Sequence, residues 1–364
     1  MKKTMGWNLE DLNSNVTTED RSLSFWLDRF SADNARNTLA DRIYWILRMS
    51  QFIYYPILAV IGVPANIVAM VILLQGKCGL SKCITHYLVA MSASDLLVVI
   101  LNLVLRHIPI VYSEYFSFVK SIRVCNIHAV LLYAATDCSV WFTIVFTFDR
   151  FVAICCQKLK RTYCVEKRAA IVLGIVTVLS CSKNISWYFM YTDMYGLQNR
   201  PWFCVLSFDV GKSYMWGAIE FAHHILTAAV PFIVILLLNI VTVRHILVSS
   251  RVRWSLLAQS TRVISRDPKM ARRRKSIILL FAISANFILS WSVFLVYSIW
   301  RRMWLLDYRS LWIDRSAREV GFMLQLLSCC TNTCIYAATQ TKFREQLKHM
   351  FKYPFTIICQ ISHR

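Results

Sequence analysis

The chain has 364 residues, of which 57% are hydrophobic and 17% are charged, and it carries a formal net charge of +21. One water-facing core cannot bury so much apolar surface, so the composition excludes an ordinary soluble protein and indicates a membrane protein. The basic residues lie between apolar runs and not on one soluble face, which argues against a nucleic-acid partner. Most of the 13 cysteines lie within those runs, where packing is a commoner role than a disulfide framework.

Seven apolar stretches are close to the roughly 20 residues that a membrane-spanning helix needs. They run from about Gln51 to Leu74, His86 to Leu105, Val124 to Ile154, Ala169 to Trp187, Tyr214 to Val243, Ser276 to Trp300, and Val320 to Ala338. Lys183 and Asn184 interrupt the fourth. The sequence predicts an all-α membrane protein, a seven-transmembrane helix bundle. Residues 1–50 are then an N-terminal segment, residues 51–339 the membrane domain, and residues 340–364 an amphipathic helix with a short tail.

Basic residues concentrate in three of the connections between these stretches, at residues 77–82, 158–168 and 251–275. Because an excess of Lys and Arg marks the cytoplasmic side, we expect an extracellular N-terminus and a cytoplasmic C-terminus in the plasma membrane. The connection between the sixth and seventh stretches is an exception, since it is basic yet expected outside. Asp307, Asp314 and Glu319 offset part of its charge.

The first fifty residues contain no stretch long enough to span a membrane. Asn15-Val16-Thr17 fits the N-glycosylation sequon, which has meaning only if the N-terminus is outside and which also arises by chance. The region from Ser24 to Arg48 forms either an amphipathic helix or a disordered tail.

The other stretches are arranged around the one from Cys125 to Arg150. As a helix it is roughly 37 Å long, somewhat more than the roughly 30 Å hydrocarbon core. Its first residue can form a disulfide where the compartment is oxidising. A buried pair of Asp149 and Arg150 at its other end can act as a switch, with a plain structural salt bridge as the alternative.

Several short motifs follow one another in order, each on a different stretch. They are Gly62-Val63-Pro64-Ala65-Asn66, Asp95 within Leu88–Leu97, Cys125 with Asp149-Arg150-Phe151, Pro231, Phe287 with Trp291, and Asn332-Thr333-Cys334-Ile335-Tyr336. In these motifs the chain resembles the rhodopsin-like (class A) G-protein-coupled receptors over about Phe52 to Phe351. The motifs of the first and seventh stretches are most similar to those of vertebrate orphan receptors of the 139-like type.

The resemblance implies a receptor that binds an extracellular ligand and activates a heterotrimeric G protein. In the family's mechanism Arg150, held by Asp149 at rest, is released to meet Tyr336 and the G protein, and Asn332 belongs to the same seventh-stretch motif. Thr333 and Val293 replace two prolines of the family, so we expect straighter sixth and seventh helices. A receptor that is uncoupled or constitutively active is therefore the alternative.

Two further features are implied by the resemblance. Cys125 and Cys204 match the pair that tethers the second extracellular loop to the third helix. The family's sodium pocket matches Asp95, Ser139, Ser328 and Asn332, whose oxygen atoms suit a small cation. A hydrogen-bonded polar cluster without an ion is the alternative reading, and no other cofactor is expected.

The expected ligand is a peptide, an amino acid or another small molecule. Leu132 stands where aminergic receptors carry an aspartate, and Leu326 where opsins carry a lysine, which argues against an amine and against retinal. The candidate pocket residues, in an aromatic and polar ring, are Asn102, Arg106, Leu132, Tyr133, Thr136, Asp137, Glu220, His223, His224, Trp291, Tyr297, Ser298, Phe322 and Gln325. Ordinary helix packing is the alternative for each. Asp137 is expected to pair with His223 or His224, or to contact the ligand.

The segment Lys342–Phe351 places Phe343, Leu347, Met350 and Phe351 on one helical face and basic residues on the other. We expect it to lie on the inner membrane surface, where anionic lipids attract Lys and Arg, with Cys359 available for palmitoylation.

Other classes of membrane protein fit less well. A metal-dependent hydrolase needs clustered ligands, and no span has two histidines at metal-binding spacing with carboxylate support. A transporter is favoured by internal repeats or by broken helices at matching positions, and neither is present in the sequence. An enzyme is therefore not expected, and a transporter is the more distant alternative.

Overall fold

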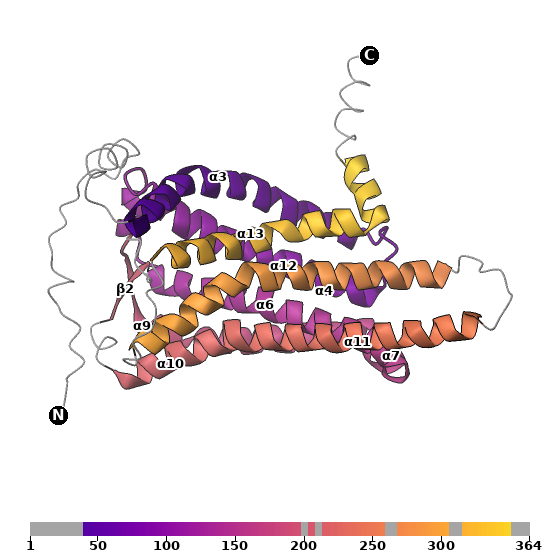
Figure 1. The fold of residues 1–364 in the computed structure, drawn as a ribbon. Helices are drawn as coiled ribbons and strands as arrows, with labels where there is room; N and C mark the ends of the chain where they lie inside the picture. Colours follow the sequence, from indigo (N-terminus) through magenta and orange to yellow (C-terminus); the bar gives the residue numbers. More distant parts are fainter. Residues whose placement is uncertain (1–38, 198–202, 208–212, 259–267, 306–314, 351–364) are drawn as a thin grey trace, which may run out of the picture.

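The computed structural model of the protein describes residues 39–197, 203–207, 213–258, 268–305 and 315–350. Within them, seven helical spans are long and apolar enough to cross a membrane, which confirms the predicted seven-helix bundle (Figure 1). The helices are α3 (Leu39–Leu74), α4 (Lys82–Val98), α5 (Ile108–Val111), α6 (Cys125–Cys155), α7 (Gln157–Tyr163), α8 (Glu166–Asn184), α9 (Ser186–Met190), α10 (Tyr214–His224), α11 (Val230–Ala258), α12 (Pro268–Leu305) and α13 (Arg315–Thr339). Two π-helical segments join consecutive helices, Val99–His107 between α4 and α5, and Ile225–Ala229 between α10 and α11.

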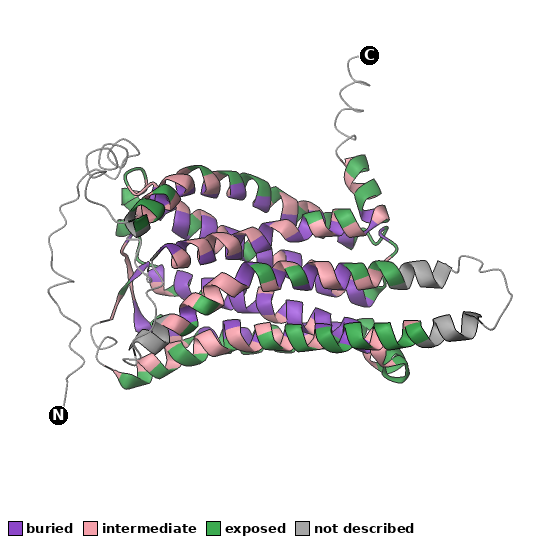
Figure 2. Ribbon diagram, in the orientation of Figure 1, coloured by how far each residue is buried: buried purple, intermediate pink, exposed green. Residues whose placement is uncertain are grey.

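Helix α6 lies at the centre of the bundle and contacts α4, α8, α11 and α12. Two-thirds of its apolar window is buried, more than in any other described span. Buried residues follow its length, whereas exposed residues lie on the outer sides of helices such as α3 and α11 (Figure 2), and many of these exposed residues are large and apolar. An outer surface of this kind suits contact with lipid. A helix of 31 residues is about 46 Å long, so its two ends reach opposite sides of a roughly 30 Å core.

The first helix begins at Leu39 and not near Gln51 as the hydropathy predicts. The polar residues that end the apolar stretch are buried and paired inside the bundle. Arg48 donates to Gln51 (2.7 Å), and Gln51 donates to Glu319 on α13 (2.8 Å). Residues 39–48 are therefore a continuation of the first span, and residues 1–38, with Asn15, lie outside the described part of the chain.

A small antiparallel sheet lies at one end of the bundle, formed by β1 (Tyr191–Tyr195) and β2 (Cys204–Leu206) (Figure 1). Cys204 in β2 is disulfide-bonded to Cys125, the first residue of α6, with the two Cα atoms 5.7 Å apart. The predicted disulfide is thereby confirmed. We call this end of the bundle the disulfide end, and the opposite end, where α6 carries Asp149 and Arg150, the Asp-Arg end.

Residues 341–350 form a helix after the seventh span, as predicted. Part of its apolar face packs against the bundle, and its position on the inner membrane surface stays a prediction. Phe343 is fully buried with its ring edge-on to Tyr336 (5.9 Å between centroids), and Leu347 and Met350 pack partly against the same core. Phe351 and Cys359 lie outside the described residues.

We predict that Cys204→Ser lowers the free energy of unfolding by about 2–4 kcal/mol, the usual contribution of a disulfide, and reduces surface expression. Cys125→Ser and the double variant should have the same effect, because each removes the same bond. Thermal unfolding of the purified chain and antibody labelling of intact cells measure the two quantities. Cys181→Ser, which removes an exposed free thiol, is the matched control. Additive effects of the two single changes would contradict the prediction.

Candidate functional site

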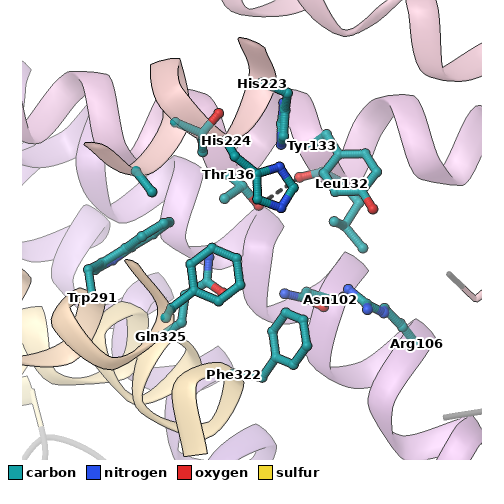
Figure 3. A pocket seen from close by; sticks show the side chains of 13 residues that line it. Asn102, Arg106, Leu132, Tyr133, Thr136, His223, His224, Trp291, Phe322 and Gln325 are labelled. Atoms are coloured by element: carbon teal, nitrogen blue, oxygen red, sulfur yellow. Dashed lines mark hydrogen bonds between the residues drawn. The ribbon is translucent and has the colours of Figure 1, made fainter. Parts of the chain in front are cut away.

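A cavity of about 50 Å³ lies among the spans toward the disulfide end (Figure 3). It is lined by Asn102, Arg106, Leu132, Tyr133, Thr136, His223, His224, Thr227, Ala228, Trp291, Phe294, Phe322 and Gln325. Both π-helical segments contribute to it, the first with Asn102 and Arg106 and the second with Thr227 and Ala228. Segments of π-helix are rare and occur often at functional sites.

Ten of the candidate pocket residues therefore line one cavity, and four do not. Glu220, Tyr297 and Ser298 lie outside its lining, as does Asp137. Thr227, Ala228 and Phe294 line the cavity although the sequence did not single them out. Apolar residues such as Ala228 and Phe294 carry no sequence signal that separates a cavity wall from ordinary packing.

Asp137 is fully buried and faces α8 and the second π-helical segment. Its carboxylate forms an ion pair with Lys183 (2.6 Å), accepts a hydrogen bond from Thr227 (2.6 Å) and accepts another from Asn184. Lys183 also donates to Thr227 (2.9 Å). The predicted pairing of Asp137 with a histidine is wrong. The sequence did offer a signal for the correct partner, because Asp137 and Lys183 are opposite charges within spans and such charges usually pair.

Aromatic rings pack against one another in the wall of the cavity next to this network. Trp187 donates its Nε1–H to Asn184 (2.9 Å) and stacks on Tyr133 with 4.5 Å between ring centroids. His223 lies edge-on to both rings. On the other side of the cavity, Trp291 stacks on Phe287 at 5.3 Å. The polar network behind Tyr133 thus fixes the aromatic surface that faces the cavity.

The charged side chain in the cavity lining is that of Arg106, which is 5% exposed. Its Nη1 donates to Asn102 Oδ1 (3.2 Å). The guanidinium carbon lies 5.1 Å from the ring centroid of Phe203 and 5.2 Å from that of Phe322. Cation–π contacts at these distances are attractive. Figure 3 shows Arg106 and Asn102 side by side at one edge of the cavity, with Trp291 at the opposite edge.

A polar cluster lies deeper in the bundle around Asp95, which is 1% exposed. Its two carboxylate oxygens accept hydrogen bonds from Ser139 on α6 (2.5 Å) and from Asn332 on α13 (2.7 Å). Asn286 on α12 donates to Ser328 Oγ (3.2 Å) and to Asn332 Oδ1 (3.4 Å). The four residues expected around a small cation therefore lie in one hydrogen-bonded cluster.

At the Asp-Arg end, Asp149 is fully buried and its carboxylate accepts hydrogen bonds from the guanidinium of Arg150, its neighbour in sequence. Cys83 on α4 donates weakly to Asp149 Oδ1 (3.4 Å), and Arg150 donates to Ser276 on α12 (3.3 Å). Burial raises the pKa of the Cys164 thiol to about 12, so it stays protonated and donates to the Asp149 carbonyl (3.6 Å). Arg150 is thus held within the bundle.

Residues 65–336 match the family model described as 7 transmembrane receptor (rhodopsin family), which covers most of the chain. The chain belongs to this family of rhodopsin-like receptors. It is 24% identical to the FMRFamide receptor of Drosophila melanogaster over 57% of its own length and 39% of that protein. It is 23% identical to G-protein coupled receptor 39 of Homo sapiens over 43% of its own length and 35% of that protein. The receptor thus spans little more than a third of the length of these relatives. Its likeness to 139-like receptors stays a prediction.

We predict that Lys183→Met destabilises the receptor by about 3–5 kcal/mol, because it leaves the carboxylate of Asp137 buried without its counter-charge. The double variant Lys183→Met with Asp137→Asn should be more stable than the single one, since no unpaired charge remains. Thermal unfolding followed by tryptophan fluorescence measures both. Lys82→Met is the matched control, because its ion pair with Glu166 is exposed and worth at most about 1 kcal/mol. Equal stability of Lys183→Met and the parent would contradict the prediction.

Proposed function

We propose that the chain is a plasma-membrane receptor that binds an extracellular ligand in its cavity and activates a heterotrimeric G protein from its Asp-Arg end. The observation that carries the proposal is the separation of two sites on one bundle. A cavity opens among the spans toward the disulfide end, and a buried arginine is held by its neighbouring aspartate at the other end. A ligand that binds one arrangement of the helices more tightly increases the population of that arrangement, and this changes the cavity and the Asp-Arg end together.

The proposed orientation rests on chemistry at the two ends. A disulfide forms where the compartment is oxidising, which supports an extracellular disulfide end. Exposed basic residues of α7 and the start of α8, among them Arg161 and Arg168, lie near the Asp-Arg end, and an excess of Lys and Arg favours the cytoplasmic side. The N-terminus is then extracellular and the C-terminus cytoplasmic.

The proposed ligand is a peptide, an amino acid or another small molecule. The name of one relative, the FMRFamide receptor, supports a peptide class, and the aromatic and polar lining of the cavity suits a small molecule or the end of a longer one. An uncoupled or constitutively active receptor is the second candidate, favoured by Thr333 and Val293 in place of prolines. Output without ligand separates these candidates.

We predict that Arg150→Ala lowers G-protein activation at least about tenfold while surface expression is retained. A hydrogen bond to a charged group contributes about 1.5–3 kcal/mol, and each 1.4 kcal/mol is tenfold in an equilibrium. Second-messenger output in cells, compared across G-protein classes, measures the effect. Arg168→Ala, which removes an exposed arginine near the same end, is the matched control. A variant at Arg150 that signals like the parent would rule out this switch.

We also propose that the Asp95 cluster holds a sodium ion. The residues fit such an ion, because Asp95, Ser139, Ser328 and Asn332 offer a carboxylate, two hydroxyls and an amide oxygen in one buried cluster. A bound cation would supply the counter-charge that the neutral donors around Asp95 lack. It would thereby favour the arrangement in which these residues stay together.

We predict that sodium chloride raises the unfolding temperature of the parent above that in choline chloride at equal ionic strength, because the ion binds the folded chain alone. The difference should disappear in Asp95→Asn, which removes the charge and keeps the shape. Asp193→Asn, at an exposed aspartate, should retain it. Equal unfolding temperatures of the parent in the two salts would refute the sodium site.

A further inference from the structure

The ion pairs of the described bundle show how its buried charges are compensated. Asp137 pairs with Lys183, Asp149 with Arg150, and Glu319 with Arg318. No carboxylate of the described residues lies within ion-pair distance of Arg106, as is also true of the buried Arg48, but Arg106 is the one of these two that lines the cavity. A charge at membrane depth is costly when it is unpaired, so a residue of this kind usually has a functional partner.

The hydrogen bonds of Arg106 are also incomplete. A guanidinium carries several N–H donors in a planar fork, and only one hydrogen bond, to Asn102, joins that of Arg106 to the described residues. Its buried Nε has no acceptor there. The rings of Phe203 and Phe322 lie beside the guanidinium, and its Nη groups, unlike Nε, are not enclosed, which leaves them as the N–H edge that can bind an acceptor in the cavity.

Two neighbouring side-chain amides, those of Asn102 and Gln325, also have hydrogen-bond donors without acceptors among the described residues. Gln325 is 5% exposed, lines the cavity, and makes no side-chain hydrogen bond to any described residue. Asn102 is 3% exposed and accepts from Arg106, while its NH₂ group has no acceptor among the described residues. Buried amides are normally hydrogen-bonded, so the free donors of Arg106, Asn102 and Gln325 around one cavity indicate a ligand that brings acceptors.

We propose that the ligand carries a carboxylate, which Arg106 binds through its N–H edge, on an apolar or aromatic body that lies between Tyr133, Trp291 and Phe322. The inference rests on the proposed use of this cavity as the ligand site. A guanidinium matches a carboxylate with two parallel hydrogen bonds. One uncompensated charge in the described lining balances a monoanion, whereas a phosphate dianion would keep an unpaired charge in an aromatic cavity.

Such a carboxylate has two sources, a small free acid or the C-terminus of a peptide. The probes are therefore two acid and amide pairs. One pair is 3-phenylpropionate with 3-phenylpropionamide, and the other is N-acetyl-Gly-Gly-Phe as the acid and as the C-terminal amide. Dissociation constants for the purified full chain in detergent follow from ligand-observed saturation-transfer NMR, which reaches weak binding. Binding of 3-phenylpropionate alone points to a small free acid, and binding of the peptide acid alone points to the C-terminus of a peptide.

We expect the acid of at least one pair to bind the parent at least about tenfold more tightly than its amide, the effect of one charge-assisted contact. The ratio should fall to near one in Arg106→Gln and remain above one in Arg106→Lys, which keeps the charge. Arg123→Gln, at an exposed arginine of the same end, should keep the parent's ratio. A merely structural arginine would give equal ratios in all four proteins.

The proposal is overturned if no acid binds the parent better than its amide, or if the preference survives in Arg106→Gln. The comparison of acid with amide in the parent needs no variant, so it stands even where a variant unfolds. Failure of the receptor function is distinguishable, because binding is measured without a G protein. Acid-selective binding by a parent that activates no G protein would support the site and contradict the coupling.

Discussion

A charge placed inside the bundle is costly unless the protein or a ligand compensates it, because the hydrocarbon around the spans offers neither water nor counter-ions. Three buried aspartates meet this constraint in three ways. Asp137 uses a lysine from another helix, Asp149 uses the arginine next to it in sequence, and Asp95 uses neutral donors from α6 and α13. The choice of partner decides which helices each aspartate ties together.

These choices make the two ends of the bundle mechanically different. The network around Asp137 joins α6 to α8 by an ion pair and to the segment before α11 by a hydrogen bond. Separating these helices would leave a buried charge without its partner. At the other end, the ion pair of Asp149 and Arg150 lies within one helix, and Asp149 reaches α4 through a weak hydrogen bond from Cys83. Arg150 reaches α12 only through one hydrogen bond to a neutral serine among the described residues. Rearrangement therefore costs least at the Asp-Arg end.

Hydropathy was enough to predict the seven spans, since each depends on the properties of a single stretch, whereas the disulfide was predicted from the resemblance to the receptor family. The start of α3 was missed because Arg48 and Gln51 look like the end of an apolar run until Glu319 of α13 is placed beside them. The partner of Asp137 was missed for the same reason, because it depends on which helix face lies opposite. The π-helical segments leave no hydropathy signal, although the first of them carries the inward-facing Asn102 and Arg106.

The second and seventh spans are joined twice, at the cavity and at the central cluster. Arg106 lies on Phe322 at the cavity, and Asp95 accepts from Asn332 deeper in the bundle. On each span the two residues are about 15 Å apart, given a rise of about 1.5 Å per residue. Helices are stiff over such lengths. A ligand that alters the spacing of Arg106 and Phe322 therefore also changes the distance between Asp95 and Asn332 and the strength of their hydrogen bond. Tyr336 lies one turn beyond Asn332 and packs on Phe343 of the helix that follows, which extends the contacts of the seventh span to the Asp-Arg end. A coupling of about 1–3 kcal/mol between distant sites is typical, and the loss of one buried hydrogen bond of this kind supplies it.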